Sequence, residues 1–123
     1  MENSLRPYVE LDLGGAPRKL QFDMNSIAEL EGVTDLPVIA DPGAASLFVR
    51  IAATGPGIRY TRALLWAALL HSEPKITLPE AGDLLTISNM QQVSLAINQA
   101  LRLFFQQQGL PLAEPVEKPT LLT

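Results

Sequence analysis

The chain contains no cysteine and only one histidine, His71. Without a thiol, neither a disulfide nor a thiolate-bound metal can form, and this absence is compatible with a reducing cytoplasm. No Ser–Asp constellation accompanies the histidine, so we interpret it as a last-turn residue that favours the helix dipole. We therefore expect no catalytic residue, no cofactor site and no metal site, and we predict that the protein is not an enzyme.

Long hydrophobic runs and clusters of positive charge are also missing. The longest unbroken apolar run, Ala63 to Leu70, is well short of the roughly 20 residues that cross a bilayer. The N-terminal stretch MENSLRPY lacks the basic start and apolar run of a signal peptide. The nine Lys and Arg residues are scattered, and the formal net charge is -4, which disfavours phosphate neutralisation. We expect a soluble cytoplasmic protein with no membrane and no nucleic-acid partner.

Two further stretches resemble chemical sites, and each has an ordinary structural interpretation. Glu29 and Glu31 lie on one short helical pattern, but no other titratable partner accompanies them, so a solvated helix face explains both. The glycine-rich stretch GPGIRYT, residues 55–61, lacks the full phosphate-loop pattern and its lysine. We interpret it as a linker with a tight turn.

Apolar sequence is abundant: 47% of the 123 residues are hydrophobic, which is enough for one core. The stretch TRALLWAALLH predicts a helix over residues 61–72, with Thr61 as its N-cap and Pro74 beyond its end. Its apolar side chains cover nearly the whole circumference, and a helix that is apolar all round is a buried one. The flanking segments must therefore wrap this helix, each with one apolar face.

A β-hairpin is predicted over residues 8–22. Apolar and polar residues alternate from Tyr8 to Leu13 and again from Arg18 to Phe22, and the intervening GGAP supplies turn chemistry. An isolated two-stranded hairpin is marginal in water. Its apolar face should therefore lie on the helices.

Two helices are predicted between the hairpin and the central helix. The first, over residues 24–32, has a Ser26–Glu29 capping box and Gly32 at its C-terminal cap. Its expected apolar stripe consists of Met24, Ile27 and Leu30. The second, over residues 42–54, begins at Asp41-Pro42 and ends at the GPG stretch. Its expected inner face consists of Ala44, Leu47, Phe48 and Ile51.

A short helix over residues 78–86, capped by TLPE, and a long helix over residues 89–108 are predicted after the central helix. The long helix has a broad apolar stripe, and its back is formed by amides with hardly a charge among them: Gln91, Gln92, Asn98, Gln99, Gln106 and Gln107. Leu95 lies on this polar side and Leu103 on its edge. Residues 110–123 contain three prolines and no apolar period, so we expect an extended or disordered C-terminal tail.

These elements predict an α+β protein that is predominantly α-helical. Its N-terminal β-hairpin should pack on a bundle of four to five helices with a central buried helix. We expect a single globular domain over residues 1–109, followed by the tail over residues 110–123.

Two blocks of the sequence, in this order and at this distance, resemble a known family. The first is VELDLGGAPRKLQFDMNSIAELE, residues 9–31, a hairpin ending in an aromatic and followed by a short helix with a Leu-Glu pair. The second is RALLWAALLHSEPKITLPEAGDLL, residues 62–85, an apolar helix, a polar break and a Thr-capped helix. Together they are similar to the small tail assembly chaperones of long-tailed bacteriophages, especially the type found in prophages and gene transfer agents, over roughly residues 8–105.

The resemblance implies a protein of the bacterial host cytoplasm that is absent from the finished virion. Such a chaperone binds the long, apolar, helix-rich tape measure protein and keeps it soluble while tail tube subunits polymerise round it. In that family a longer product is often made by ribosomal frameshifting. The expected partners are the tape measure protein and, as a second candidate, the tail tube protein.

Four leucines are the candidate partner-binding residues: Leu95, Leu103, Leu110 and Leu112. The first two lie among the amides of the long helix, and burying amides costs less than burying ions. The other two belong to the tail. A holdase needs such apolar contact sites near its surface, surrounded by polar groups that prevent self-aggregation.

Three other functions stay open. A structural or adaptor helical protein of a phage particle would remain in that particle. A small acidic dimeric regulator would use Leu95 and Leu103 for self-association. A small hydrolase or metal enzyme would need a cluster of His, Cys, Asp or Glu side chains round a pocket, and the chain has one histidine and no cysteine.

Overall fold

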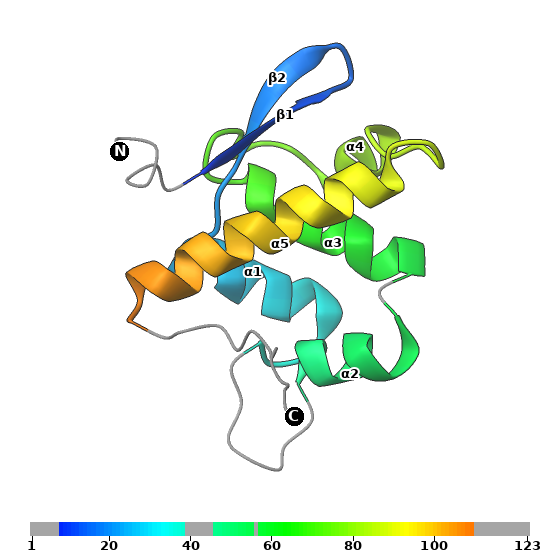
Figure 1. The fold of residues 1–123 in the computed structure, drawn as a ribbon. Coiled ribbons are helices and arrows are strands. Elements are labelled where there is room, and N and C mark those ends of the chain that lie inside the picture. Colours follow the sequence, from blue (N-terminus) through cyan, green and yellow to red (C-terminus); the bar gives the residue numbers. More distant parts are fainter. Residues whose placement is uncertain (1–7, 39–45, 56, 110–123) are drawn as a thin grey trace, which may run out of the picture.

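The computed structural model describes residues 8–38, 46–55 and 57–109, and within them an antiparallel hairpin precedes five helices (Figure 1). This confirms the α+β, predominantly helical class. Figure 1 shows the hairpin at the top of the molecule and α2 at the opposite side, with α5 crossing α3 between them. The elements are β1 (Val9–Leu13), β2 (Ala16–Leu20), α1 (Met24–Thr34), α2 (Leu47–Thr54), α3 (Gly57–Leu69), α4 (Leu78–Asp83) and α5 (Met90–Gln107).

The hairpin turn is tighter than the sequence predicts. Only Gly14 and Gly15 lie between the paired residues Leu13 and Ala16, and both glycines have positive φ, 62° and 82°. A two-residue turn of this kind needs φ above zero at both central positions, which glycine adopts without strain. The expected four-residue turn is therefore wrong, and Pro17 lies within β2.

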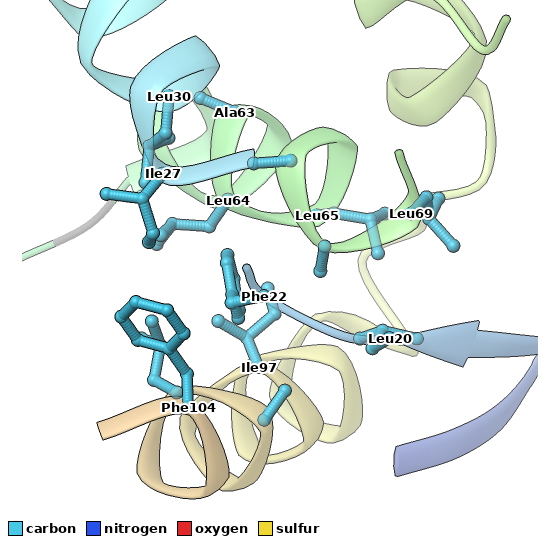
Figure 2. Close-up of a cluster of buried hydrophobic side chains, with 14 of the residues drawn as sticks. Leu20, Phe22, Ile27, Leu30, Ala63, Leu64, Leu65, Leu69, Ile97 and Phe104 are labelled. Atoms are coloured by element: carbon cyan, nitrogen blue, oxygen red, sulfur yellow. The ribbon is translucent and has the colours of Figure 1, made fainter. Parts of the chain in front are cut away.

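Helix α3 is the buried centre of the molecule, as expected. Its buried residues are Thr61, Ala63, Leu64, Leu65, Ala67, Ala68 and Leu69. In Figure 2 the leucines of α3 face Phe22, which follows β2, and Ile97 and Phe104 of α5. The backbone N–H of Gln21 also donates to the carbonyl of Ala68 at 2.9 Å, so the chain leaving the hairpin is tied directly to α3.

The predicted ends of α3 are wrong. The helix begins at Gly57, so Thr61 lies inside it, 1% exposed, and its Oγ1 donates to the carbonyl of Gly57. Within a helix, a threonine hydroxyl can donate a hydrogen bond to the carbonyl four residues earlier. Threonine is therefore compatible with the N-cap position and with the helix interior. The helix ends at Leu69, before His71.

The N-cap of helix α1 lies about one turn before the predicted capping residue, Ser26. Asp23 is the N-cap and its side chain accepts from the N–H of Ser26, while the Ser26 hydroxyl accepts from the N–H of Asp23; both distances are 2.8 Å. Ser26 is thus the third helical residue and not the cap. The C-cap is Asp35, in a left-handed conformation, so Gly32 lies inside the helix.

The apolar stripe of α1 is partly as predicted. Ile27 and Leu30 are buried, but Met24, the first residue of the helix, is 60% exposed. Of the two carboxylates expected on a solvated face, Glu29 is exposed, whereas Glu31 is half-buried and accepts from the N–H of Val38 at 2.7 Å. The Glu31 carboxylate therefore accepts a hydrogen bond from a backbone N–H group in the segment that follows α1.

Helix α2 begins at Leu47, later than predicted. Ser46 is extended and its hydroxyl accepts from the N–H of Val49 at 3.2 Å, which is an N-cap geometry. The predicted start at Asp41-Pro42, and Ala44 of the expected inner face, lie outside the described residues. The helix stops at Gly55, as the GPG stretch predicts, and α3 starts almost at once.

The two C-terminal helices lie close to their predicted positions. Thr77 caps α4 and forms the expected reciprocal box with Glu80, although α4 ends at Asp83 and is shorter than predicted. Asn89 occupies the N-cap position of α5. The predicted tail, residues 110–123, lies outside the described residues. None of the described helices is long and apolar enough to cross a membrane.

Candidate partner-binding groove

A groove runs between α2 and α5, with α3 as its floor; we call it the α2–α5 groove. It consists of two adjoining cavities of about 290 and 200 Å³ that share Phe48, Asn98 and Leu101. Its apolar lining residues are Phe48, Ile51, Leu64, Ile97, Leu101 and Phe105. Its polar lining residues are Thr61, Ser94, Asn98 and Arg102. An apolar interior with a few polar groups is typical of surfaces that bind apolar segments.

The groove follows from the spacing of residues on two helices. Ser94, Asn98, Leu101 and Phe105 recur at intervals of four, three and four, which places them in one row along α5. On α2, Phe48 faces the same space, and its ring meets that of Phe105 edge-on at a centroid distance of 6.4 Å. This edge-to-face contact, which is favourable at such distances, joins the α2 and α5 sides of the groove.

The two leucines predicted to bind a partner do not share one surface. Leu95 is 58% exposed, as expected for the polar side of α5, whereas Leu103 is half-buried. At about 100° per residue, the two directions on an ideal helix differ by about 80°. Leu95 precedes Asn98 by three residues and therefore lies beside the groove. Its partner-binding role stays a prediction.

The other two predicted contact residues, Leu110 and Leu112, lie outside the described residues. Of the two predicted leucines that the structure describes, only Leu95 lies at the edge of the groove. Leu101 and Phe105 belong to the buried core, as the apolar stripe of the long helix predicts, and Phe48 packs against that core. The sequence did not show that these residues also line a groove. One sequence signal was present: the row that contains Asn98 mixes polar and apolar residues, which marks the border of an apolar stripe.

The amide side of α5 is exposed as predicted, at Gln91, Gln92, Asn98, Gln99, Gln106 and Gln107. Asn98 belongs both to this side and to the groove. The surface next to the groove is therefore polar but uncharged along much of α5. Such a surface stays hydrated in the free protein and costs less to bury than a surface of Lys and Glu.

A second cavity, of about 420 Å³, contains the one histidine. Its lining includes His71, Asp23, Ser26 and Trp66, and His71 Nδ1 lies 2.9 Å from Asp23 Oδ2. The expected last-turn position of His71 is wrong, because α3 ends at Leu69 and the imidazole instead pairs with the N-cap of α1. The pair was not predicted from the sequence, because its two residues are 48 positions apart in the chain.

Three effects act on the acid of that pair. Burial raises the pKa of Asp23, but the hydrogen bond from the Ser26 N–H and the contact with His71 together lower that pKa below its ordinary value. Both side chains stay well exposed, at 37% for Asp23 and 50% for His71. Among the described residues, no group of three or more His, Asp and Glu side chains is placed to hold a metal ion.

A third cavity, of about 650 Å³, lies between β2, α4 and the segment that joins α3 to α4, and it has charged walls of both signs. Arg18 donates from Nη1 to Glu73 Oε1 at 2.7 Å and from Nε to the carbonyl of Leu13 at 3.0 Å. Lys75, Glu80 and Asp83 also line it. Its size does not make it the better site for an apolar chain, because a partner entering it would have to desolvate these charges.

The α2–α5 groove is the candidate site that combines an apolar interior, aromatic walls and a border of amides on α5. Besides its apolar side chains, the groove's described lining offers hydroxyl, amide and guanidinium groups, and none of the described lining residues is a carboxylate or an imidazole. Comparison of the chain with protein-family models, with curated proteins and with solved structures finds no match.

Proposed function

We propose that this protein is a tail assembly chaperone of a long-tailed phage, prophage or gene transfer agent. It binds the tape measure protein in the cytoplasm of the bacterial host and keeps it soluble while the tail tube polymerises. The observation that carries the proposal is the α2–α5 groove, an apolar channel bordered by Leu95 and the amides of α5. The resemblance of residues 9–31 and 62–85 to this family supports it from the sequence.

A chaperone of this kind has to offer an apolar surface without aggregating itself. The groove satisfies both needs, because its apolar side chains are recessed between two helices while Asn98 and neighbouring amides keep the border hydrated. The buried α3 gives the groove a fixed floor, so little ordering is required when a partner binds. The tail tube protein is the second candidate partner.

Co-purification with the tape measure protein of the same gene cluster tests the proposal. Leu95→Asp and Ile51→Glu place a carboxylate beside and inside the groove, and each should lower recovery of the tape measure protein by about 10-fold, since burying an unpaired charge is costly. Ile87→Asp is the matched control, because Ile87 is 90% exposed and is not among the groove's lining residues. Unchanged recovery with both groove variants would exclude the groove as the binding site.

Composition of purified particles separates the chaperone from the other phage role. A chaperone leaves before the tail is complete, so mass spectrometry of particles should detect the tape measure protein without this chain. Stoichiometric presence of the chain would instead establish a structural or adaptor protein. A stable dimer in light scattering that persists without the tape measure protein, together with failure to co-purify with it, would support the regulator.

A further inference from the structure

The two outer edges of the β1–β2 hairpin differ in how their backbone groups are used. The residues that flank the two-residue turn exchange backbone hydrogen bonds, and such pairs alternate along an antiparallel ladder. The pairs Glu10–Lys19 and Asp12–Pro17 are therefore the ones whose backbone groups point outward from the hairpin. Proline at position 17 fits this register, because the N–H that it lacks would not belong to the ladder.

The β2 edge is closed by α3 and by the turn that follows α3. The Ser72 hydroxyl donates to the carbonyl of Lys19 at 3.2 Å. The N–H of Gln21, just beyond β2, donates to the carbonyl of Ala68 at 2.9 Å. Because Pro17 offers no N–H either, this side has no continuous row of free backbone groups for a further strand.

The β1 edge is open within the part of the chain that the structure describes. The outward backbone groups of Glu10 and Asp12 have no hydrogen-bond partner among the described residues, and both residues are exposed. Val9 of β1 is half-buried, whereas Leu20, which lies opposite it on β2, is fully buried. A third strand beside β1 would therefore continue both the ladder and the apolar face of the hairpin.

The open edge is also the acidic one. Neither the Glu10 nor the Asp12 carboxylate has an ion-pair partner among the described residues. Lys19 lies opposite Glu10, but its ammonium lies over the Tyr8 ring, 4.8 Å from the ring centroid. Asp12 lies opposite Pro17 and so faces no charge across the ladder. Both carboxylates are thus placed to interact with side chains directly opposite them on an added strand.

These charges oppose pairing with a second copy of the chain. Antiparallel pairing of two β1 strands about Leu11 would align their apolar faces and would place Glu10 opposite Asp12 of the second copy. Like charges directly opposite each other on neighbouring strands are destabilising. The carboxylates therefore select against self-association and in favour of a strand with basic residues at the same positions.

We infer that the β1 edge binds an extended segment of a partner protein in which Lys or Arg alternates with apolar residues. The segment pairs with the outward backbone groups of Glu10 and Asp12 and places its basic side chains opposite the two carboxylates. Its apolar side chains lie beside Val9 and Leu11. This surface is separate from the α2–α5 groove, so the inference goes beyond the proposed function.

Three synthetic peptides of about seven residues test the inference with the full chain. One alternates Lys with Val, and the second has Glu in place of each Lys. The third is the Lys peptide with N-methyl groups on the amides of its Lys residues, which face β1 in an antiparallel pairing. Fluorescence anisotropy at about 50 mM NaCl should show the unmodified Lys peptide binding about 10-fold or more tighter than either of the others. The N-methylated peptide keeps the charge of the Lys peptide, so its weaker binding isolates the backbone pairing.

Amide hydrogen exchange followed by NMR locates the contact. The Lys peptide should slow exchange of the Glu10 and Asp12 N–H groups by about 10-fold or more, because both groups then donate to the peptide. The N–H of Lys19, on the closed edge, is the control and should change little.

Two substitutions at position 12 separate the charge from the N–H. Asp12→Asn removes the carboxylate but keeps the N–H, and it should weaken binding of the Lys peptide about 3-fold. Asp12→Pro also removes the N–H, which the hairpin ladder does not use, and it should weaken binding about 10-fold or more. The far-UV circular dichroism of both variants should match that of the native chain.

Equal affinity for the Lys and Glu peptides, or undiminished binding of the N-methylated peptide, would overturn the inference. So would slow exchange of the Glu10 and Asp12 N–H groups in the chain without peptide. Protection that rises with protein concentration would assign the edge to a second copy, and protection that does not would assign it to another segment of the same chain. Peptide binding at this edge does not depend on recovery of the tape measure protein, so the inference and the proposed function fail separately.

Discussion

His71 Nδ1 lies 2.9 Å from Asp23 Oδ2, which joins the turn after α3 to the N-cap of α1. The contact connects α1 and α3, which pack on each other in the core. It lies at the N-terminus of α1, where the first backbone N–H groups have no partner within the helix. Asp23 both caps α1 and contacts the turn after α3, because its Oδ1 accepts from the Ser26 N–H and its Oδ2 lies next to the His71 imidazole.

Asp23 should make stability fall in acid. The pKa of this carboxyl is lower in the folded protein than its ordinary value of 3.8, so its contribution is complete above that value and is lost as pH falls through the folded pKa. Asp23→Ala should lower the free energy of unfolding by about 1 kcal/mol at neutral pH, because the cap is lost. Asp23→Asn keeps a capping group without the charge and should cost less.

Urea unfolding of these variants at several pH values checks the prediction. The gap between the native chain and Asp23→Asn should narrow as pH falls from about 4 to about 2, because the native carboxyl becomes protonated and loses the charge that distinguishes it. A gap that is constant over this range would mean that the negative charge of Asp23 does not stabilise the fold.

Leu65 should be among the residues most sensitive to truncation. It is fully buried in α3, so Leu65→Ala removes buried apolar surface and leaves a cavity, and the free energy of unfolding should fall by about 2–5 kcal/mol. Leu95→Ala removes the same atoms from a side chain that is 58% exposed and should cost less than about 1 kcal/mol. Chemical denaturation of the two variants in parallel measures both free energies of unfolding. If the two variants lost similar amounts of stability, α3 would not be the buried core of the protein.

The two glycines of the hairpin turn should differ in their tolerance of alanine. Both have positive φ, so Gly14→Ala and Gly15→Ala should each cost about 1 kcal/mol through backbone strain. A Cβ at Gly14 would also lie 2.7 Å from Leu84 Cδ2, whereas a Cβ at Gly15 meets nothing within 4 Å. Thermal unfolding should therefore give a lower Tm for Gly14→Ala. The reverse order would contradict the packing of the turn against Leu84.

The ion pair between Arg18 and Glu73 should be weakly stabilising. Its atoms are 2.7 Å apart and its side chains are 21% and 33% exposed, so solvent screens part of the attraction. A double-mutant cycle with Arg18→Gln and Glu73→Gln should give a coupling of about 0.5–1 kcal/mol that decreases with added salt. A coupling free energy near zero at low salt would indicate that only apolar contacts hold the hairpin to the segment between α3 and α4, which contains Glu73.

Local patterns predicted most of the secondary structure, because they depend on neighbours in the chain. The reciprocal box of Thr77 and Glu80 was correct, since both partners lie within one turn. The failures were also local in origin: Ser26, Thr61 and Gly32 are each compatible with a cap and with a helix interior. Burial in the folded protein decides between these positions, and a sequence window does not contain that information.

The candidate site was less predictable than the fold. The exposure of Leu95 followed from its place among the amides of α5, and Phe105 is a core residue as predicted, but the sequence did not show that Phe48 and Phe105 also line a groove. Whether an aromatic residue fills the core or lines a groove depends on how closely its helix approaches the next one. That distance is set by packing between segments far apart in the chain.

The sequence by itself determined that α3 is interior, because a helix apolar on nearly every side has no stable place at the surface. Only the tertiary structure decided that α2 and α5 leave a recess between them and that His71 meets Asp23. Periodicity and charge can be read from each segment separately. A recess or a contact between two residues exists only after folding, when the packing of a third segment brings two distant segments together.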